Sequence, residues 1–180
     1  MAIAPSPARL PSPFLAPRYQ VSPNLELALL KPVEASQAGV LCASMDPWAR
    51  YPVSAAEMTS FFLSVEPGVP RFAIRWNGVF DGVITIKTNW FSGPYIQTFA
   101  LAPVLQGRGI GSAVMAFIER EARAAQSRNL WVAASDFNAG ALRFYERIGY
   151  HRLAEIDSLL RDNRTEILMR KKLFASPQPR

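Results

Sequence analysis

Three closely spaced glycines separate a strand-like run from the most regular helical pattern in this 180-residue chain. The run Tyr95–Leu101 is apolar and extended in character, and the apolar residues of Ile110–Gln126 recur at helical spacing. Glycine lets the backbone approach a ligand closely, and the start of a helix offers unpaired N–H groups and a positive dipole end. Arg108 adds a positive charge inside the loop. The spacing therefore predicts a cradle for an anion such as a phosphate.

Two common phosphate-binding loops do not match these residues. A Walker loop requires glycine, lysine and then serine or threonine after a spacer, and this order is absent from the sequence. The dinucleotide-binding fingerprint, read from Gly107, requires a third glycine where Ser112 stands. What fits instead is the pattern Gln-x-x-Gly-x-Gly, formed by Gln106, Gly109 and Gly111.

A second pattern lies downstream of the loop and combines a strand with the start of a helix. The apolar run Leu130–Ala134 is followed by Asn-x-x-Ala, then by a tyrosine and by a glycine–aromatic pair. These positions are filled by Asn138, Ala141, Tyr145, Gly149 and Tyr150. With both patterns in this order, the sequence resembles the GNAT superfamily of N-acetyltransferases. The resemblance covers residues 72–173 in detail and residues 24–71 only by the order of elements.

This resemblance implies acetyl-CoA as the acetyl donor and no metal. It implies a sheet that opens between Tyr95–Leu101 and Leu130–Ala134, with the pantetheine arm in the opening. Backbone groups of Phe99 and Leu101 would meet the acetyl carbonyl and the pantetheine amides, and Asn138 would bond the pantetheine. The pyrophosphate would be held by the whole loop, which consists of Gln106, Gly107, Arg108, Gly109, Ile110, Gly111 and Ser112.

The resemblance also places the side chain of Tyr145 at the sulfur of the donor, which makes it the candidate general acid. A departing thiolate has a pKa of about 8.5, so a phenol can supply its proton. The general base stays open among Asp81, Asp136 and a chain of waters through Gln97. Asp136 is better explained as a cap of the helix that follows, and Asp81 as part of a turn region. An acceptor with a low amine pKa would need no base.

The elements around these patterns are strands and helices in mixed order. Strands are expected over residues 25–29, 72–76, 79–87, 95–101, 130–134, 150–156 and 165–173, and helices over 33–45, 55–63, 110–126 and 138–148. This order predicts an α/β (α+β) domain with helices on both faces of a mixed sheet. With the resemblance, the expectation becomes a GNAT-like, mostly antiparallel sheet of six to seven strands, splayed between its fourth and fifth strands.

Proline dominates the amino-terminal stretch. Six of the fifteen prolines lie within residues 1–23, where they disfavour helix and central strand. Residues 1–23 are therefore expected to form a flexible or extended arm, residues 24–174 a single domain and residues 175–180 a tail. The arm either docks on a partner, straps over a neighbouring subunit or is a loose terminus, and the last of these is preferred.

The composition narrows the classes of function. Twenty basic and fourteen acidic residues give a net charge of +6, which favours an anionic ligand: nucleic acid, a membrane surface or a phosphorylated cofactor. Nucleic acid is not expected, because no strand interleaves aromatic with basic residues. One cysteine and one histidine exclude an intrachain disulfide and the usual metal sites. No apolar run is long enough to cross a membrane, and the start lacks a signal-peptide pattern, so a cytoplasmic protein is expected.

The acceptor side is less constrained by the sequence. Either an acceptor wall with apolar bulk, or core and dimer contacts, would be formed by Trp48, Arg50, Tyr51, Phe61, Phe62, Trp90 and Phe91. A homodimer is left open on these residues. Cys42 is expected to pack rather than act as a nucleophile, and His151 is expected at a surface or sheet edge.

The leading prediction is an acetyl-CoA-dependent N-acetyltransferase. It would move the acetyl group directly to an amine of a small molecule or peptide within a ternary complex. A protein N-terminus or a lysine is the alternative acceptor. A non-catalytic CoA- or nucleic-acid-binding protein on the same fold is the alternative of another class.

Overall fold

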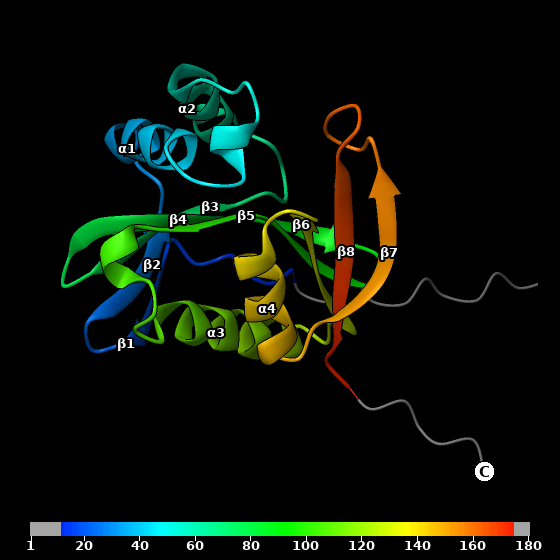
Figure 1. The fold of residues 1–180 in the computed structure, drawn as a ribbon. Coiled ribbons are helices and arrows are strands. Elements are labelled where there is room, and N and C mark those ends of the chain that lie inside the picture. Colours follow the sequence, from blue (N-terminus) through cyan, green and yellow to red (C-terminus); the bar gives the residue numbers. More distant parts are fainter. Residues whose placement is uncertain (1–11, 175–180) are drawn as a thin grey trace, which may run out of the picture.

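Strands and helices cover most of residues 12–174, the part of the chain that the computed structural model describes (Figure 1). The strands are β1 (Arg18–Ser22), β2 (Leu25–Leu29), β3 (Arg71–Trp76), β4 (Val79–Trp90), β5 (Gly93–Leu101), β6 (Asn129–Ser135), β7 (His151–Asp157) and β8 (Thr165–Lys172). The α-helices are α1 (Pro32–Ala43), α2 (Ala55–Leu63), α3 (Ile110–Ala124) and α4 (Ala139–Arg147). Two short 3-10 turns are η1 (Trp48–Arg50) and η2 (Pro103–Leu105).

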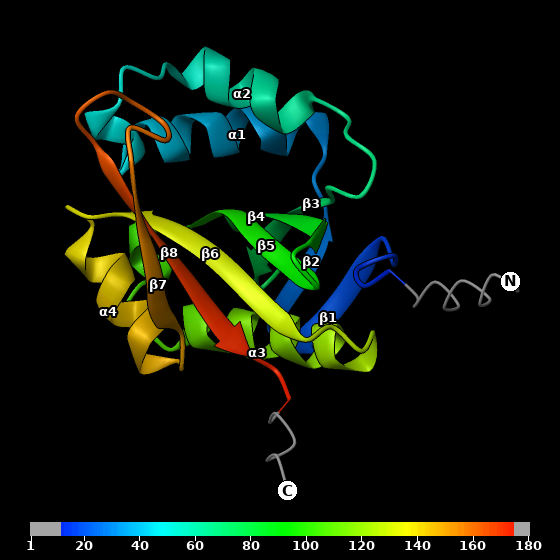
Figure 2. The same cartoon turned by 90° about the vertical axis from the view of Figure 1, so that its right-hand side faces the viewer.

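The strands form one sheet that separates two layers of helices. Its order is β1-β2-β3-β4-β5-β6-β8-β7, and every neighbouring pair is antiparallel except β5 and β6. Helices α1 and α2 cover one face, and α3 and α4 cover the other (Figures 1 and 2). The predicted α/β (α+β) architecture is confirmed. Within residues 12–174, no helix combines the length and the apolar character needed to cross a membrane.

Two apolar cores fill the space between the sheet and the helices. The larger core lies on the α3 and α4 side, where Ile84, Ile118 and Met169 are fully buried. The smaller core lies under α1 and α2 and includes Cys42 and Phe62. Cys42 packs as predicted, and burial raises the pKa of its thiol to about 12. A neutral, enclosed thiol is a poor nucleophile.

Strand β1 lies inside the stretch that the proline pattern assigned to an arm. It pairs with β2, with Tyr19 opposite Leu27, and the preceding Phe14 is 4% exposed in the larger core. The prediction that the arm extends to residue 23 is therefore wrong, and the sheet has eight strands rather than six to seven. The prolines do not interrupt β1, because none lies within Arg18–Ser22: Pro17 directly precedes the strand and Pro23 directly follows it. Residues 1–11 and the predicted tail, residues 175–180, lie outside the described part of the chain.

The packing of Phe14 gives a first test. Phe14→Ala is expected to lower the free energy of unfolding by about 3 kcal/mol, because it removes a buried ring from the core. The neighbouring Leu15 is 76% exposed, so Leu15→Ala should change it by less than about 0.5 kcal/mol. Denaturant unfolding followed by circular dichroism measures both. If both variants changed the free energy of unfolding by the same small amount, Phe14 would not be packed in the core and the segment would be a loose arm.

The two halves of the sheet meet at β5 and β6, where the pairing is short. The register joins Tyr95 to Trp131 and Ile96 to Val132, and β5 and β6 pair at no other position. Residues 97–101 of β5 therefore have a backbone edge that is not paired with β6. This edge lies where the sequence predicted the sheet to open. The splay itself stays a prediction.

A β-bulge in β5 changes which side chains share a face. Gln97 is an extra residue opposite the step from Thr85 to Ile86, so the alternation shifts at that point. Ile96 and Leu101 consequently belong to the same core on the α3 side. Tyr95, which precedes the bulge, no longer shares a face with Leu101 as strict alternation would require. The bulge thus places Tyr95 and Leu101 on opposite faces of the sheet.

Candidate functional site

A cavity of about 660 Å³ lies where the end of β5 meets the starts of α3 and α4. We call it the first cavity, and its volume is within the range of ligand pockets, about 300–1,000 Å³. Of the site residues predicted from the sequence, these line it: Phe99, Leu101, Gln106, Gly107, Gly109, Gly111, Ser112, Asn138 and Tyr145. Residues from three separate segments are therefore brought together as expected.

The loop before α3 is built to expose its backbone. The side-chain amide of Gln106 donates to the carbonyl of Leu101 over 2.9 Å, which ties the loop to the end of β5. Gly109 is the N-cap of α3 with a φ of 78°, a left-handed conformation that favours glycine, and no side chain caps the helix. The first helical bond runs from Ala113 N–H to Gly109. The three N–H groups before Ala113 have no partner within the helix, which suits an anion.

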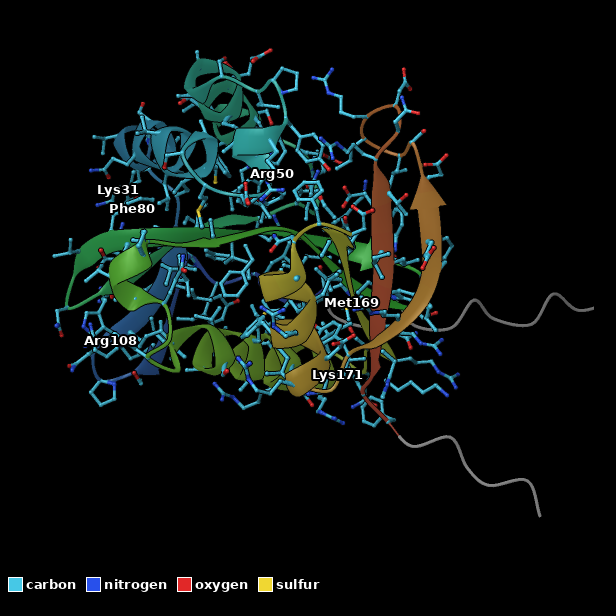
Figure 3. The ribbon with its side chains drawn as sticks, viewed as in Figure 1. Lys31, Arg50, Phe80, Arg108, Met169 and Lys171 are labelled. Carbon is cyan, nitrogen blue, oxygen red and sulfur yellow. The ribbon has the colours of Figure 1, made fainter. Side chains whose placement is uncertain are left out.

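Two residues of the predicted loop do not line the first cavity. Arg108 lies at the outer edge of the molecule (Figure 3), with its guanidinium 5.7 Å from the centre of the Trp76 ring. Its side chain also donates weakly to the carbonyl of Val104, at 3.5 Å. Ile110 is 7% exposed and points into the larger core. Ile110 therefore contributes only its backbone, and the expected contact of the Arg108 charge with a phosphate has no support in this arrangement.

Helix α4 begins with a side-chain cap at the other wall of the cavity. The cap is Asn138, whose side-chain oxygen accepts from Ala141 N–H over 3.1 Å. The preference for Asp136 as the cap was therefore wrong, since Asp136 accepts from the adjacent Phe137 N–H instead. The side-chain nitrogen of Asn138 keeps its donor capacity on the cavity wall.

The free edge of β5 turns its polar groups away from β4. Ala102 N–H donates to the backbone carbonyl of Asp81 on β4 over 2.8 Å. In an antiparallel ladder every second residue bonds to the same neighbouring strand, so Ala100 is the next residue of β5 that bonds to β4. The backbone groups of Phe99 and Leu101 therefore point toward β6. Apart from the carbonyl of Leu101, which Gln106 occupies, these groups remain as donors and acceptors beside the first cavity.

Tyr145 lies on the cavity wall with a hindered but available hydroxyl. Its ring centre is 5.1 Å from that of Phe144 and 5.4 Å from that of Tyr150. The side chain is 6% exposed, and among residues 12–174 its hydroxyl has no hydrogen-bond partner. Burial, and secondarily the nearby Tyr95, raise the pKa of Tyr145 above its usual value of 10.0. The phenol is therefore protonated at neutral pH and able to donate.

A second cavity of about 300 Å³ opens on the side of the sheet that carries η1. It is lined by residues of β5, β6, the η1 region and the β7–β8 loop: Pro47, Trp48, Tyr51, Val53, Tyr95, Gln97, Ala133, Ala134, Ser135, Leu159, Leu160, Arg161 and Glu166. The β7–β8 loop rises from the sheet toward the side of α1 and α2 (Figures 1 and 2). Both cavities are therefore lined in part by residues of β5 and of the connection that follows α1.

A buried carboxylate forms the polar centre of the second cavity. Glu166 is 3% exposed, and its Oε1 accepts from the hydroxyls of Tyr51 and Ser135, each over 2.7 Å. The two hydroxyls are also 2.8 Å from each other. Burial raises the pKa of Tyr51, and the charge of Glu166 adds to this shift. The tyrosine is therefore a proton-bearing donor that holds the carboxylate in place.

The residues that the sequence assigned either to an acceptor wall or to core and dimer contacts lie in different places. Trp48 and Tyr51 line the second cavity, whereas Phe62 is buried in the smaller core with Phe61 packed against it. Phe91 is 69% exposed. The other two residues of that set are in contact with neighbours. Arg50 pairs with Asp46 at 3.0 Å, and the Trp90 ring centre is 5.0 Å from that of Phe91.

Several residues on the walls of both cavities were not predicted from the sequence. On α4, Gly140, Phe144 and Arg147 line the first cavity at helical spacing, so periodicity from Asn138 could have found them. Of the proposed bases, Gln97 lines the second cavity, whereas neither cavity includes Asp81 or Asp136. No sequence signal indicated Glu166, which is the only carboxylate on the wall of the second cavity. His151 is exposed on the edge strand β7, as predicted.

The comparison with family models identifies the chain. The model described as the acetyltransferase (GNAT) family matches residues 38–150, more than half of the chain. The protein therefore belongs to the GNAT acetyltransferase family, as the two sequence patterns indicated. A search of curated proteins gave no match. Across the described residues, no group of histidine, cysteine, aspartate and glutamate is arranged to hold a metal ion.

Solved structures share the fold at low sequence identity. A GNAT-family protein from Desulfovibrio desulfuricans has a TM-score of 0.69 and 19% identity, over 83% of this chain and 99% of its own. The ribosomal-protein-S18-alanine N-acetyltransferase from Escherichia coli has a TM-score of 0.67 and 16% identity, over 87% and 98%. An aminoglycoside 6'-N-acetyltransferase in complex with coenzyme A has a TM-score of 0.63 and 16% identity, over 82% and 95%.

Proposed function

We propose that the protein is an acetyl-CoA-dependent N-acetyltransferase that acetylates an amine of a small molecule or peptide within a ternary complex. The observation that carries this proposal is the wall of the first cavity. There, the uncapped start of α3, the free edge of β5 and the hydroxyl of Tyr145 converge on one space. The acceptor enters from the second cavity, on the opposite side of the β5–β6 junction.

The residues of the first cavity fit the donor. A Cβ built on Gly107 or Gly109 would meet no atom within 4 Å, so the loop leaves room for a ligand against its backbone. The free N–H groups of α3 suit a pyrophosphate, and Arg147 adds a positive charge on the wall. The acidic residue of the wall, Asp46, is paired with Arg50 at 3.0 Å. The related aminoglycoside enzyme holds coenzyme A, which is consistent with this assignment.

Acetyl-CoA supplies an acetyl group activated as a thioester. The chain orients that group with the N–H and C=O groups of Phe99 and the N–H of Leu101, and it anchors the phosphates at the start of α3. Backbone donors at a carbonyl oxygen stabilise the negative charge that grows there when an amine attacks. Tyr145, protonated at neutral pH, gives its proton to the departing sulfur. Neither step requires a nucleophilic side chain.

Binding of acetyl-CoA tests the proposal before any acceptor is known. At about 100 times the dissociation constant, ligand binding stabilises a protein by about 2.7 kcal/mol, so the melting temperature should rise by several degrees. Differential scanning fluorimetry with acetyl-CoA measures the shift, and inorganic pyrophosphate at the same concentration is the control for simple anion binding. An unchanged transition at millimolar acetyl-CoA would remove the proposal.

A further inference from the structure

Within the described part of the chain, the carboxyl group of the second cavity, Glu166, has no cationic partner. Among residues 12–174, Glu166 makes no salt bridge. Its Oε1 accepts from both hydroxyls, whereas Oε2 accepts no hydrogen bond from the described residues and is not fully enclosed by them. A buried carboxylate is costly unless a charge or hydrogen bonds compensate it. Oε2 therefore offers the cavity an acceptor for a cation.

Glu166 lies near the part of the sheet where β5 borders the first cavity. Counted from the register of Ile96 and Val132, Phe99 on β5 and Ser135 on β6 both lie three residues further along parallel strands. Glu166 stands directly opposite Ser135 on β8. The carboxylate thus lies beyond the last β5–β6 pair, on the same side of that pair as the unpaired part of β5 and two strands away from it.

The groups around Glu166 connect the two cavities. Tyr51 donates to it, and Tyr95 is close enough for the charge of Glu166 to raise the tyrosine's pKa, after the larger effect of burial. Tyr95 in turn raises the pKa of Tyr145 in the first cavity. Two basic groups lie near this cluster: Arg161, on the cavity wall, and Arg164, whose charge reaches Tyr51. Strand β6 faces Glu166 with the neutral Ser135.

The walls also limit what the amine can carry. Trp48, Leu159 and Leu160 supply apolar surface, and Leu159 and Leu160 are more than half exposed at the loop. Arg161 would repel a second ammonium group, because like charges in a confined space disfavour binding. The cavity volume of about 300 Å³ suits one small molecule or the end of a chain. This chemistry favours one ammonium group on an uncharged, apolar body.

We infer that Glu166 binds the ammonium group of the acceptor and takes its proton, and that the acceptor is a small monoamine with an apolar body. The inference rests on the proposed acetyltransferase function. It assigns the general base that the sequence left open to a residue of β8, held in place by Tyr51 and Ser135.

The transfer of the acetyl group to the amine moves protons and electron pairs as follows. The ammonium gives one proton to Oε2 of Glu166, and the nitrogen lone pair then forms the new C–N bond. The C–S bond breaks with its electron pair on sulfur, which takes the proton of Tyr145. The nitrogen returns its surplus proton to the oxygen of Tyr145, and Glu166 releases its own to solvent. The products are the acetamide, coenzyme A and one proton.

The test compares Glu166→Gln with the wild type, using 2-phenylethylamine as the acceptor and acetyl-CoA as the donor. Glutamine can still accept from Tyr51 and Ser135, so the fold should be retained, but it cannot take a proton. We expect kcat/KM for the amine to fall about 10²-fold at pH 7. The loss should shrink toward pH 10, because an amine with a pKa of about 10.4 becomes neutral without help. Glu155→Gln, an exposed site on β7, is the matched control and should behave as the wild type.

Binding measurements separate this inference from the proposed function. Calorimetric titration of 2-phenylethylamine into the protein with coenzyme A should show binding to the wild type and at least tenfold weaker binding to Glu166→Gln. Acetyl-CoA should stabilise both proteins equally. Spermidine should be a poorer acceptor than 2-phenylethylamine. If acetyl-CoA fails to stabilise the wild type, the proposed function is wrong; a wild type that binds acetyl-CoA but prefers spermidine overturns the inference alone.

A second variant guards against a folding defect in the first. Ala133→Leu fills part of the second cavity and keeps the carboxylate of Glu166, and it should raise the KM for the amine while acetyl-CoA binding stays as in the wild type. A wild-type pH profile and kcat/KM in Glu166→Gln, or a loss that is the same at every pH, would overturn the assigned role. The carboxylate would then only join the η1 region to the sheet.

Discussion

Replacing Tyr145 with phenylalanine is expected to lower kcat about 10²-fold while leaving the affinity for acetyl-CoA nearly unchanged. The hydroxyl is the only part removed, and among residues 12–174 it has no hydrogen-bond partner, so the fold loses little. Steady-state kinetics and the melting-temperature shift with acetyl-CoA measure the two effects. In the wild type, burial holds the pKa of Tyr145 above 10.0, so its deprotonation should not reduce the rate between pH 7 and pH 10.

A neighbouring tyrosine provides the control for this experiment. Tyr150 is 2% exposed in the same core, and its ring centre is 5.4 Å from that of Tyr145. Its hydroxyl is buried and has no hydrogen-bond partner within residues 12–174. It does not line the first cavity. Tyr150→Phe should therefore keep full activity and wild-type stability or better, because removal of an unpaired buried hydroxyl costs little. If Tyr145→Phe is as active as Tyr150→Phe, Tyr145 has a packing role only.

Gly109→Asp is expected to reduce the affinity for acetyl-CoA by at least about 10²-fold. The new carboxylate would stand at the start of α3, where it would meet the phosphates as a like charge and fill the space against the backbone. The left-handed φ of 78° adds a folding cost of about 1 kcal/mol for any side chain. Calorimetric titration with acetyl-CoA measures the affinity, and denaturant unfolding measures the folding cost.

Gly78 allows the folding cost to be subtracted. It has a φ of 81°, and a Cβ there would also meet no atom within 4 Å. The residue lies in the turn between β3 and β4, outside both cavities. Gly78→Asp should therefore lose similar stability yet bind acetyl-CoA as the wild type does. Equal affinities in the two variants would contradict the placement of the phosphates at α3.

The parts of the structure that the sequence predicted depend on local patterns. Helix α2 begins and ends where the apolar spacing placed it, at Ala55–Leu63, because a capping box between Ser54 and Glu57 reinforces the periodicity. The loop before α3 was also predictable from a local pattern, because Gly109 directly precedes the regular apolar spacing of the helix and serves as its N-cap. Most of the first cavity follows from this loop, from the end of β5 and from the segment that begins at Asn138.

What could not be predicted depends on contacts between distant segments. Tyr51, Ser135 and Glu166 form one cluster, although 84 and 31 residues separate successive members along the chain. Nothing in the pattern of each segment indicates the others. Strand β1 was missed because its pairing with β2 and the burial of Phe14 outweigh the local effect of the prolines. The contact of Arg108 with a phosphate stays a prediction, because charge and position in a loop do not determine the direction of a long side chain.

The bulge at Gln97 has a consequence for how this scaffold can change. Phe99 and Leu101, after the bulge, line the first cavity, whereas Tyr95, before it, lines the second. In the proposed ternary complex, a single strand would serve the two ligands through separate sets of positions. Substitutions in the second cavity would then redirect the choice of acceptor while the residues that line the first cavity stay the same. Under the proposed function, one half of a two-substrate reaction could diversify while the other half stays constant.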